Sequence, residues 1–346
     1  MFSKLQQLPQ TPVAVAFTPN SVLNLSQPQT VAPACVMING TRFSTCTDVG
    51  WFNSNRYLAT LNFAAETLHV YAFHPQDHSL TLVQTWSNQD GMQMQWPEKM
   101  AFSKDGRYLA ISNIKGHLPS LNLYSIDSQT HLINPVPFKV IEHSHANHGV
   151  RFTPNGQYLV SSTIDDEGLI LIYKLEREPN GTLDVTLSQV VQNPYLPLKP
   201  KSVNFSSDGS LMVVCYSPNA DRIYQHSGAL VIYAFDNETG TIRPQPLCER
   251  IGLPELQYPD DACFSHDEES SILIVPTQGD HSILFYPFDK RTSQIDPQFF
   301  AFTNPEAQLS FPHGVSLSSD DNYLAVSNYG DDKVTVYSMK QAIQSE

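Results

Sequence analysis

Polar and ionisable residues recur at one position of a repeated sequence unit, four residues before an apolar anchor that is usually phenylalanine. In chain order this position holds Val13, Asp48, Glu98, His148, Lys201, Asp260 and His313. Imidazole, ammonium and carboxylate groups transfer protons and stabilise developing charge. If the fold gathers them in one place, burial and crowding will shift their pKa values toward such chemistry. We call the six polar members the axial set.

The anchors belong to a repeat made of an apolar strand, a short turn and a second apolar strand. Clear copies are AFSKDGRYLAISN from residue 101, RFTPNGQYLVSST from residue 151 and NFSSDGSLMVVCYS from residue 204. The Asp-Gly and Asn-Gly pairs suit the tight turn of a β-hairpin. The complete series of anchors is Phe17, Phe52, Phe102, Phe152, Phe205, Phe264 and Leu317. A repeat of this length is typical of propeller blades or solenoid units.

Every repeat except the first continues with a third strand that ends near a tyrosine, as in LHVYAF and VTVYSM, and then a more polar fourth strand. Four strands per repeat are typical of a propeller blade. We therefore predict an all-β protein in which residues 1–346 form one seven-bladed β-propeller with four antiparallel strands per blade. Residues 1–10 are expected to supply the outer strand of the last blade and close the ring. Six blades are the alternative, if residues 11–46 only lead into the first blade.

The inner strands of a propeller converge on one axis, so the axial set should share one mouth of the ring. The alternative is that loop-to-strand junctions are polar simply because they are wet. The loops between second and third strands should add hydrogen-bonding groups on the same face, among them Asn113 and Asn328, which bind a ligand or cap the strand ends. The insertion at 217–227 adds Arg222, and extra loops on a rigid scaffold often carry binding roles.

Charge and cysteine content exclude several classes of function. The chain has 20 Lys and Arg against 34 Asp and Glu, a net charge of −14, which disfavours nucleic acid and anionic membranes as partners. No apolar stretch has the length of a membrane span or signal peptide. Five scattered cysteines without a CxxC pair favour a reducing, cytoplasmic location. We expect Cys215 and Cys263 to be buried thiols.

No metal or other cofactor is expected from the sequence. The His143 to His148 segment is rich in histidine but lacks partners at zinc-site spacing. A calcium ion bound by Asp48, Glu98 and Asp260 is the alternative. No sequence feature indicates the oligomeric state.

Two strings, His148-Gly149-Val150-Arg151-Phe152 and Pro312-His313-Gly314-Val315, resemble the blade signature of the propeller lactonase family, which includes 6-phosphogluconolactonase-like and carboxymuconate-lactonizing enzymes. The resemblance implies a seven-bladed fold with chemistry on a lactone or its open acid at the central mouth. The family pattern has a Glu at the start of the sixth inner strand and an Arg after the second strand. This sequence has Asp260 and Thr277 there, and threonine does not replace a guanidinium that binds carboxylate or phosphate.

Two functions follow as hypotheses. The first is a lactonase, a carboxylic ester hydrolase, or a lactonizing cyclase or isomerase that acts on a small lactone or sugar acid. His148, Lys201 and Glu98 are then catalytic, with His148 as general base or acid and Lys201 stabilising the oxyanion. Substrate binding falls to Asp48, Asp260, His313, Asn113, Asn328 and Arg222. The second is a non-catalytic propeller that binds a small ligand or a protein segment on the same face.

Overall fold

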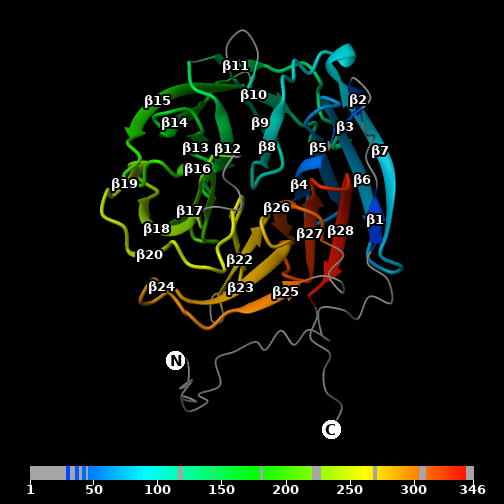
Figure 1. Cartoon of the computed structure of the whole chain (residues 1–346). Coiled ribbons are helices and arrows are strands. Elements are labelled where there is room, and N and C mark those ends of the chain that lie inside the picture. Colours follow the sequence, from blue (N-terminus) through cyan, green and yellow to red (C-terminus); the bar gives the residue numbers. More distant parts are fainter. Residues whose placement is uncertain are drawn as a thin grey trace, which may run out of the picture.

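Each complete repeat folds as one antiparallel sheet, and the sheets are arranged around a common centre (Figure 1). The structure is a computed structural model that describes residues 29–31, 36–38, 41–43, 46–115, 120–142, 144–179, 182–219, 227–267, 271–303 and 309–339. These residues form β-strands and one short 3-10 helix, η1 (Asn88–Asp90). The prediction of an all-β propeller is therefore confirmed. No helix among the described residues is long and apolar enough to cross a membrane.

The first three blades contain four strands each. Blade 1 contains β4 (Cys46–Phe52), β5 (Tyr57–Asn62), β6 (Thr67–His74) and β7 (Ser79–Ser87). Blade 2 contains β8 (Pro97–Phe102), β9 (Tyr108–Asn113), β10 (Ser120–Ser125) and β11 (Lys139–Glu142). Blade 3 contains β12 (Asn147–Phe152), β13 (Tyr158–Thr163), β14 (Ile170–Arg177) and β15 (Leu183–Val191).

In blades 4 and 5 the outer position is shared by two short strands. Blade 4 contains β16 (Lys199–Phe205), β17 (Leu211–Ser217), β18 (Ala229–Asp236), β19 (Thr241–Ile242) and β20 (Cys248–Ile251). Blade 5 contains β21 (Cys263–Phe264), β22 (Ile272–Thr277), β23 (Ser282–Asp289), β24 (Gln294–Ile295) and β25 (Phe300–Thr303). Blade 6 contains β26 (Pro312–Leu317), β27 (Tyr323–Asn328), β28 (Lys333–Ser338) and, paired with β28, β1 (Gln29–Val31). A separate hairpin joins β2 (Val36–Ile38) and β3 (Thr41–Phe43).

The described residues form six blades, where seven were expected. Their inner strands contact one another in the cyclic order β4, β8, β12, β16, β21, β26 and back to β4. The expected first repeat is the shortest in the series and lacks a third strand with a tyrosine, and its anchor Phe17 lies outside the described residues. Residues 1–10, expected to close the last blade, also lie outside them, and the strand beside β28 is β1.

Apolar faces of neighbouring blades pack together to form the core. The tyrosines of the third strands are buried between blades, with Tyr124 and Tyr286 both 0% exposed. Cys215 and Cys263 lie in such clusters, are free, and are 0% and 6% exposed. The prediction of buried thiols is confirmed, and burial raises the pKa of both, which keeps them protonated and unreactive.

The inner strands share an irregularity close to where they start. Pairing with the second strand shifts register between Cys46 and Asp48, Pro97 and Met100, Asn147 and Val150, Pro200 and Ser202, and Pro312 and Gly314. A β-bulge of this kind leaves one residue unpaired and changes the direction of the side chains around it. The axial set lies at or beside these bulges.

The glycine after each axial histidine is required by close packing. A Cβ at Gly149 would lie 2.4 Å from Ser162 Oγ, 2.9 Å from the Cα of Ser202 and 3.0 Å from the carbonyl oxygen of Lys201. A Cβ at Gly314 would lie 2.4 Å from Asp48 Oδ1. The His-Gly pairs therefore reflect how closely neighbouring inner strands approach each other near the axis.

Gly149→Ala is therefore expected to destabilise the protein by about 1–3 kcal/mol, the usual cost of overpacking, because part of the obstruction is backbone. Gly50→Ala is the matched control in β4, where a Cβ meets only the side chains of Phe102 and Met100, at 3.2 Å or more. Urea unfolding of both variants measures the difference. Equal stability of the two variants would contradict the packing argument.

Candidate functional site

The six described members of the axial set are buried around the propeller axis, none more than 7% exposed. As predicted, these residues converge: side chains from different blades contact one another at the axis. The alternative, that these positions are polar only because they are wet, does not describe these six residues, because they are buried. Val13 lies outside the described residues.

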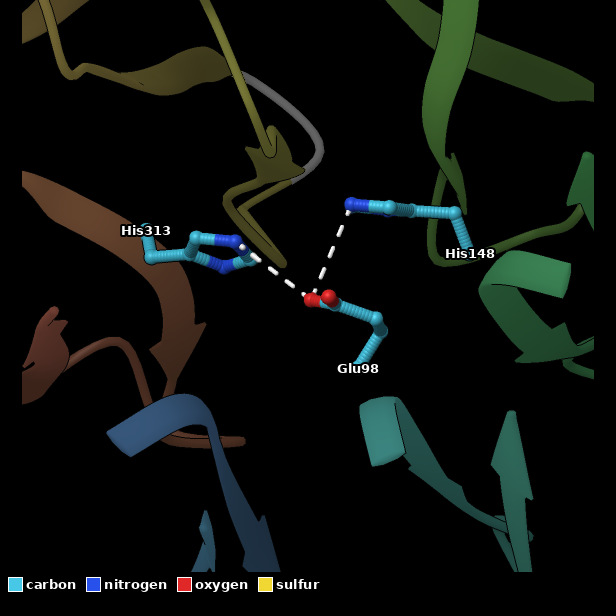
Figure 2. Close-up of side chains that lie close together, drawn as sticks. All are labelled: Glu98, His148 and His313. Carbon is cyan, nitrogen blue, oxygen red and sulfur yellow. Dashed lines mark ion pairs between the residues drawn. The ribbon is translucent and has the colours of Figure 1, made fainter. Parts of the chain in front are cut away.

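Glu98, His148 and His313 form one cluster, which we call the axial triad. Glu98 Oε2 lies 3.7 Å from His148 Nε2 and 3.6 Å from His313 Nε2. Figure 2 shows the carboxylate between two imidazoles that approach it from different strands. The two rings are nearly parallel, with an interplanar angle of 24° and centroids 5.8 Å apart. Because β12 and β26 are three places apart in the cyclic order of six, the histidines face each other across the axis.

The hydrogen bonding of His148 settles which of its nitrogens carries the proton. Nδ1 lies 2.7 Å from the carbonyl oxygen of Lys201, and a carbonyl only accepts, so Nδ1 donates. Burial lowers the pKa of His148 well below its usual value, and the Lys201 ammonium lowers it further. The imidazole is therefore neutral, and the lone pair of Nε2 faces Glu98. A neutral imidazole in this orientation can accept a proton or bind a metal ion.

Glu98 is the acidic partner of the axial triad. Burial raises its pKa to about 8, and the nearby Asp260 carboxylate contributes to the increase. Its Oε2 atom accepts no hydrogen bond from the described residues. A buried carboxylate oxygen without a partner is unusual and calls for a physical reason.

Lys99 is a site residue that the sequence analysis missed. Its ammonium lies 3.3 Å from Asp261 Oδ2, 3.4 Å from Asp260 Oδ2 and 3.9 Å from Asp48 Oδ1. It also donates to the carbonyl oxygen of His313 at 3.0 Å. Burial lowers the pKa of Lys99, but the three aspartates outweigh burial and raise it above the usual lysine value. Lys99 is therefore a charged centre that joins β8 to the opposite side of the ring.

Asp48 and Asp261 also hold neighbouring blades together. Asp48 Oδ2 accepts a hydrogen bond of 2.7 Å from the backbone nitrogen of Met100, and Asp261 Oδ2 accepts one of 3.3 Å from Val315. Burial, the largest effect, raises the pKa of Asp48 to about 6, although Lys99 acts in the opposite direction. Both aspartates are thus engaged in joining blades.

Lys201 is the second buried ammonium group of the axis. Its Nζ lies 5.3 Å from the centroid of the Tyr258 ring. Burial lowers the pKa of Lys201, but Tyr258 and Asp260 reverse the effect and raise it. Lys201 therefore keeps its charge beside the neutral His148.

The other predicted binding residues accept hydrogen bonds from backbone groups or lie outside the described residues. Asn113 Oδ1 accepts from the backbone nitrogen of Gln95 at 2.9 Å, and Asn328 Oδ1 accepts from Ser310 at 3.0 Å. These bonds support strand capping, the alternative left open from the sequence. Arg222 lies outside the described residues. His145 pairs with Asp165 at 2.8 Å rather than with the axial histidine.

The raised pKa of Glu98 makes stability depend on pH. A carboxyl that binds its proton more tightly in the folded state contributes full stability below its unfolded pKa, near 4.3, and that contribution is lost as pH rises toward about 8. Glu98→Gln removes this loss, so we expect the variant to be more stable than the native sequence at pH 8, by on the order of 3 kcal/mol, and similar at pH 4.5.

Urea unfolding at both pH values, with a chelator present, measures this effect. Glu167→Gln is the matched control, because Glu167 is exposed in a loop. If Glu98→Gln is no more stable than the native protein at pH 8, the carboxyl is not held in an unfavourable environment.

Comparisons with known proteins agree with this architecture. Residues 10–147 match the sequence model of a family described as Lactonase, 7-bladed beta-propeller. That description has one blade more than the described residues form. No curated protein sequence matches the chain significantly.

Solved structures show the fold. A Bacteroides uniformis protein provisionally assigned as a 6-phosphogluconolactonase matches with a TM-score of 0.54 and 15% identity, covering 75% of this chain and 71% of that one. The periplasmic gluconolactonase of Pseudomonas aeruginosa gives 0.50 and 15%, covering 77% and 90%. The Cps50 (Swd1) β-propeller domain of Myceliophteria thermophila gives 0.54 and 12%, covering 90% and 100%. The family match to residues 10–147 thus confirms that the chain resembles the propeller lactonase family, as its His-Gly-Val strings indicated.

Proposed function

We propose that the protein acts on a small lactone, or on the corresponding open sugar acid, at the propeller axis. The observation that carries the proposal is the neutral His148, whose Nε2 lone pair faces Glu98 while Lys201 lies beside it. A base and a cation placed together in a dry site suit ester hydrolysis, in which a proton moves and an oxyanion forms. The resemblance to propeller lactonases supports the same class of substrate.

In the proposed hydrolysis, His148 Nε2 takes a proton from water as the water oxygen attacks the lactone carbonyl. The Lys201 ammonium stabilises the negative oxygen of the tetrahedral intermediate. The ring C–O bond then breaks, and the leaving oxygen takes the proton back from the imidazolium. The product is the open hydroxy acid, and the reverse sequence closes the ring. Glu98, Asp260 and His313 orient the water and the substrate.

In this proposal the substrate enters between His148 and His313, whose ring centroids are 5.8 Å apart. Binding therefore requires the two rings to separate, which favours a small, flat ring over a bulky one. The proposal uses no cofactor and places the protein in a reducing compartment, in keeping with the four described cysteines, all free and buried.

A non-catalytic binding propeller is the second candidate. The observation that favours it is the close pairing of Lys99 with three buried aspartates, which uses much of the axial charge to join blades. Such a propeller would bind a small molecule or a protein segment on the same face without turnover.

The deciding experiment compares five- and six-membered lactones of sugar acids with a plain aliphatic lactone in a pH-stat assay, with spontaneous hydrolysis subtracted. The lactonase proposal expects enzyme-dependent acid release that His148→Asn lowers by about 10²–10⁴-fold. Ligand-induced thermal stabilisation without acid release from any lactone would favour the binding propeller. Acid release that His148→Asn leaves unchanged would contradict the assignment of the base.

A further inference from the structure

The axial triad has the composition and geometry of a metal-binding site. Glu98, His148 and His313 are buried, and each offers a ligand atom that lies within 4.8 Å of the other two. We propose that these three residues bind a divalent transition-metal ion on the propeller axis. Two imidazoles and one carboxylate are a ligand set that proteins use for zinc and for non-haem iron, with further coordination positions left open.

The distances leave room for an ion between the side chains. Bonds from zinc to His nitrogen or carboxylate oxygen are about 2.0–2.2 Å long, so two ligand atoms of one ion are at most about 4.2 Å apart. The contacts of 3.7 Å and 3.6 Å from Glu98 Oε2 to the two Nε2 atoms satisfy this limit. Both ring nitrogens are directed at the same carboxylate oxygen (Figure 2), and all three ligand atoms lie within 4.8 Å of one another, so only a small closing movement brings them to bonding distance.

Contacts outside the axial triad hold both imidazoles in the orientation that metal binding needs. His148 Nδ1 donates to the carbonyl oxygen of Lys201, which leaves Nε2 unprotonated. His313 Nδ1 lies 3.1 Å from Asp260 Oδ2, an oxygen that accepts no hydrogen bond from the described residues. A proton on that Nδ1 completes the pair and leaves Nε2 free as well. Metal-bound histidines usually have such a carbonyl or carboxylate partner on the second nitrogen.

Lys99 Nζ also lies 3.3 Å from His313 Nδ1, and because an ammonium group only donates, this contact competes with Asp260 for the same ring nitrogen. The carbonyl oxygen of His313 and the carboxylates of Asp261 and Asp260 lie at 3.0, 3.3 and 3.4 Å. Metal binding at Nε2 selects the tautomer in which Nδ1 carries the proton and donates to Asp260 Oδ2, while Lys99 keeps its hydrogen bonds to Asp261 and to the carbonyl oxygen of His313.

Two further observations favour a cation at this place. Glu98 Oε2 is buried, points at both histidines, and accepts no hydrogen bond from the described residues. Three buried aspartates (Asp48, Asp260 and Asp261) surround the single ammonium group of Lys99. A dication would offset this excess, which is costly to bury unpaired.

The ligand set argues for a transition metal and against calcium. Calcium prefers six to eight oxygen ligands, whereas imidazole suits zinc, iron, copper and nickel. The calcium site considered from the sequence needs Asp48 and Asp260, and both are paired with Lys99. A site centred on the two histidines is therefore chemically distinct from that alternative.

The test is metal binding by the full chain after dialysis against a chelator. Titration calorimetry with Zn²⁺ should show one equivalent bound, and Co²⁺ should give the visible absorption of a site with nitrogen and oxygen ligands. Glu98→Gln, His148→Ala and His313→Ala should each weaken Zn²⁺ binding more than about 100-fold, beyond the 10–100-fold loss typical of an outer partner. His145→Ala, which changes a histidine paired with Asp165, should bind like the native protein.

Glu98→Gln also separates loss of a ligand from loss of the fold, because it replaces a buried carboxyl by a neutral group of the same shape. Its circular dichroism should match that of the native protein while Zn²⁺ binding is lost. The proposal is overturned if the native protein binds no stoichiometric Zn²⁺ or Co²⁺, or if binding survives in all three variants. Metal binding is measured separately from the proposed lactonase activity, which is assayed on metal-free protein. The metal site and the lactonase function can therefore each be disproved without the other.

Discussion

Replacing Lys99 with methionine is expected to lower the free energy of unfolding by about 3–5 kcal/mol, the usual cost of removing one partner from a buried ion pair. The side chain is only 3% exposed and faces the carboxylates of Asp48, Asp260 and Asp261. Without the ammonium group, these charges stay buried beside one another with no cation of their own. Urea unfolding at pH 7 of the native and variant proteins measures the loss.

Lys333→Met is the matched control, since Lys333 forms a 2.9 Å pair with Asp331 at the surface and is about half exposed. An exposed pair contributes at most about 1 kcal/mol. Adding Asp261→Asn to Lys99→Met should restore part of the lost stability, because it removes one of the stranded charges. A loss below that of Lys333→Met would show that Lys99 does not balance the axial carboxylates.

His148→Asn is expected to lower kcat on any lactone that the native protein hydrolyses by about 10²–10⁴-fold, the usual contribution of a general base. Asparagine keeps a donor near the carbonyl oxygen of Lys201, to which the His148 ring is bonded. It lacks a basic nitrogen facing Glu98. Steady-state kinetics on metal-free protein, with a thermal melt to check folding, measure the effect.

The pH profile gives a second readout of the same residue. Burial keeps the pKa of His148 well below the usual histidine range, so the base stays unprotonated under mildly acidic conditions. The native protein should therefore keep its kcat at pH values where an exposed histidine would already be charged. Full activity of His148→Asn, together with losses in Glu98→Gln and Lys201→Met, would mean that the site is real but its base is elsewhere.

The repeat predicted the propeller because its period and turns are local features. Phe102, Phe152 and Phe205 each end an inner strand, as the anchors required. The same register predicted the axial set, since equivalent positions of a repeat reach equivalent places in space. What the pattern did not predict was Lys99 and Asp261, one residue beyond the axial positions. Regular strands alternate their side chains, and the bulge in β8 breaks this alternation, so Glu98 and Lys99 both reach the axis.

Whether a residue near the axis is buried, and which groups it binds, also depends on contacts between residues far apart in the sequence. Nothing in the local sequence of Asn113 or Asn328 distinguishes a ligand contact from a strand cap; the backbone groups they bind belong to loops that only the fold brings near. The pairing of Lys99 with residues more than 160 positions away in the sequence is of the same kind. The number of blades also depended on a non-local contact. Residues of the expected first repeat form β1, which pairs with β28 of the last blade instead of starting a blade of its own.

The contact that Lys99 makes across the axis limits the diameter of the propeller. Strands β8 and β21 belong to opposite blades, yet the Lys99 ammonium reaches Asp261 at 3.3 Å. One lysine side chain therefore reaches across the ring that the six described blades form. Each added blade lengthens the circumference, so a ring with one more blade would draw these groups apart and admit water between them. The number of blades thus sets how dry the axis is, and with it the proton affinities of every group that faces the axis.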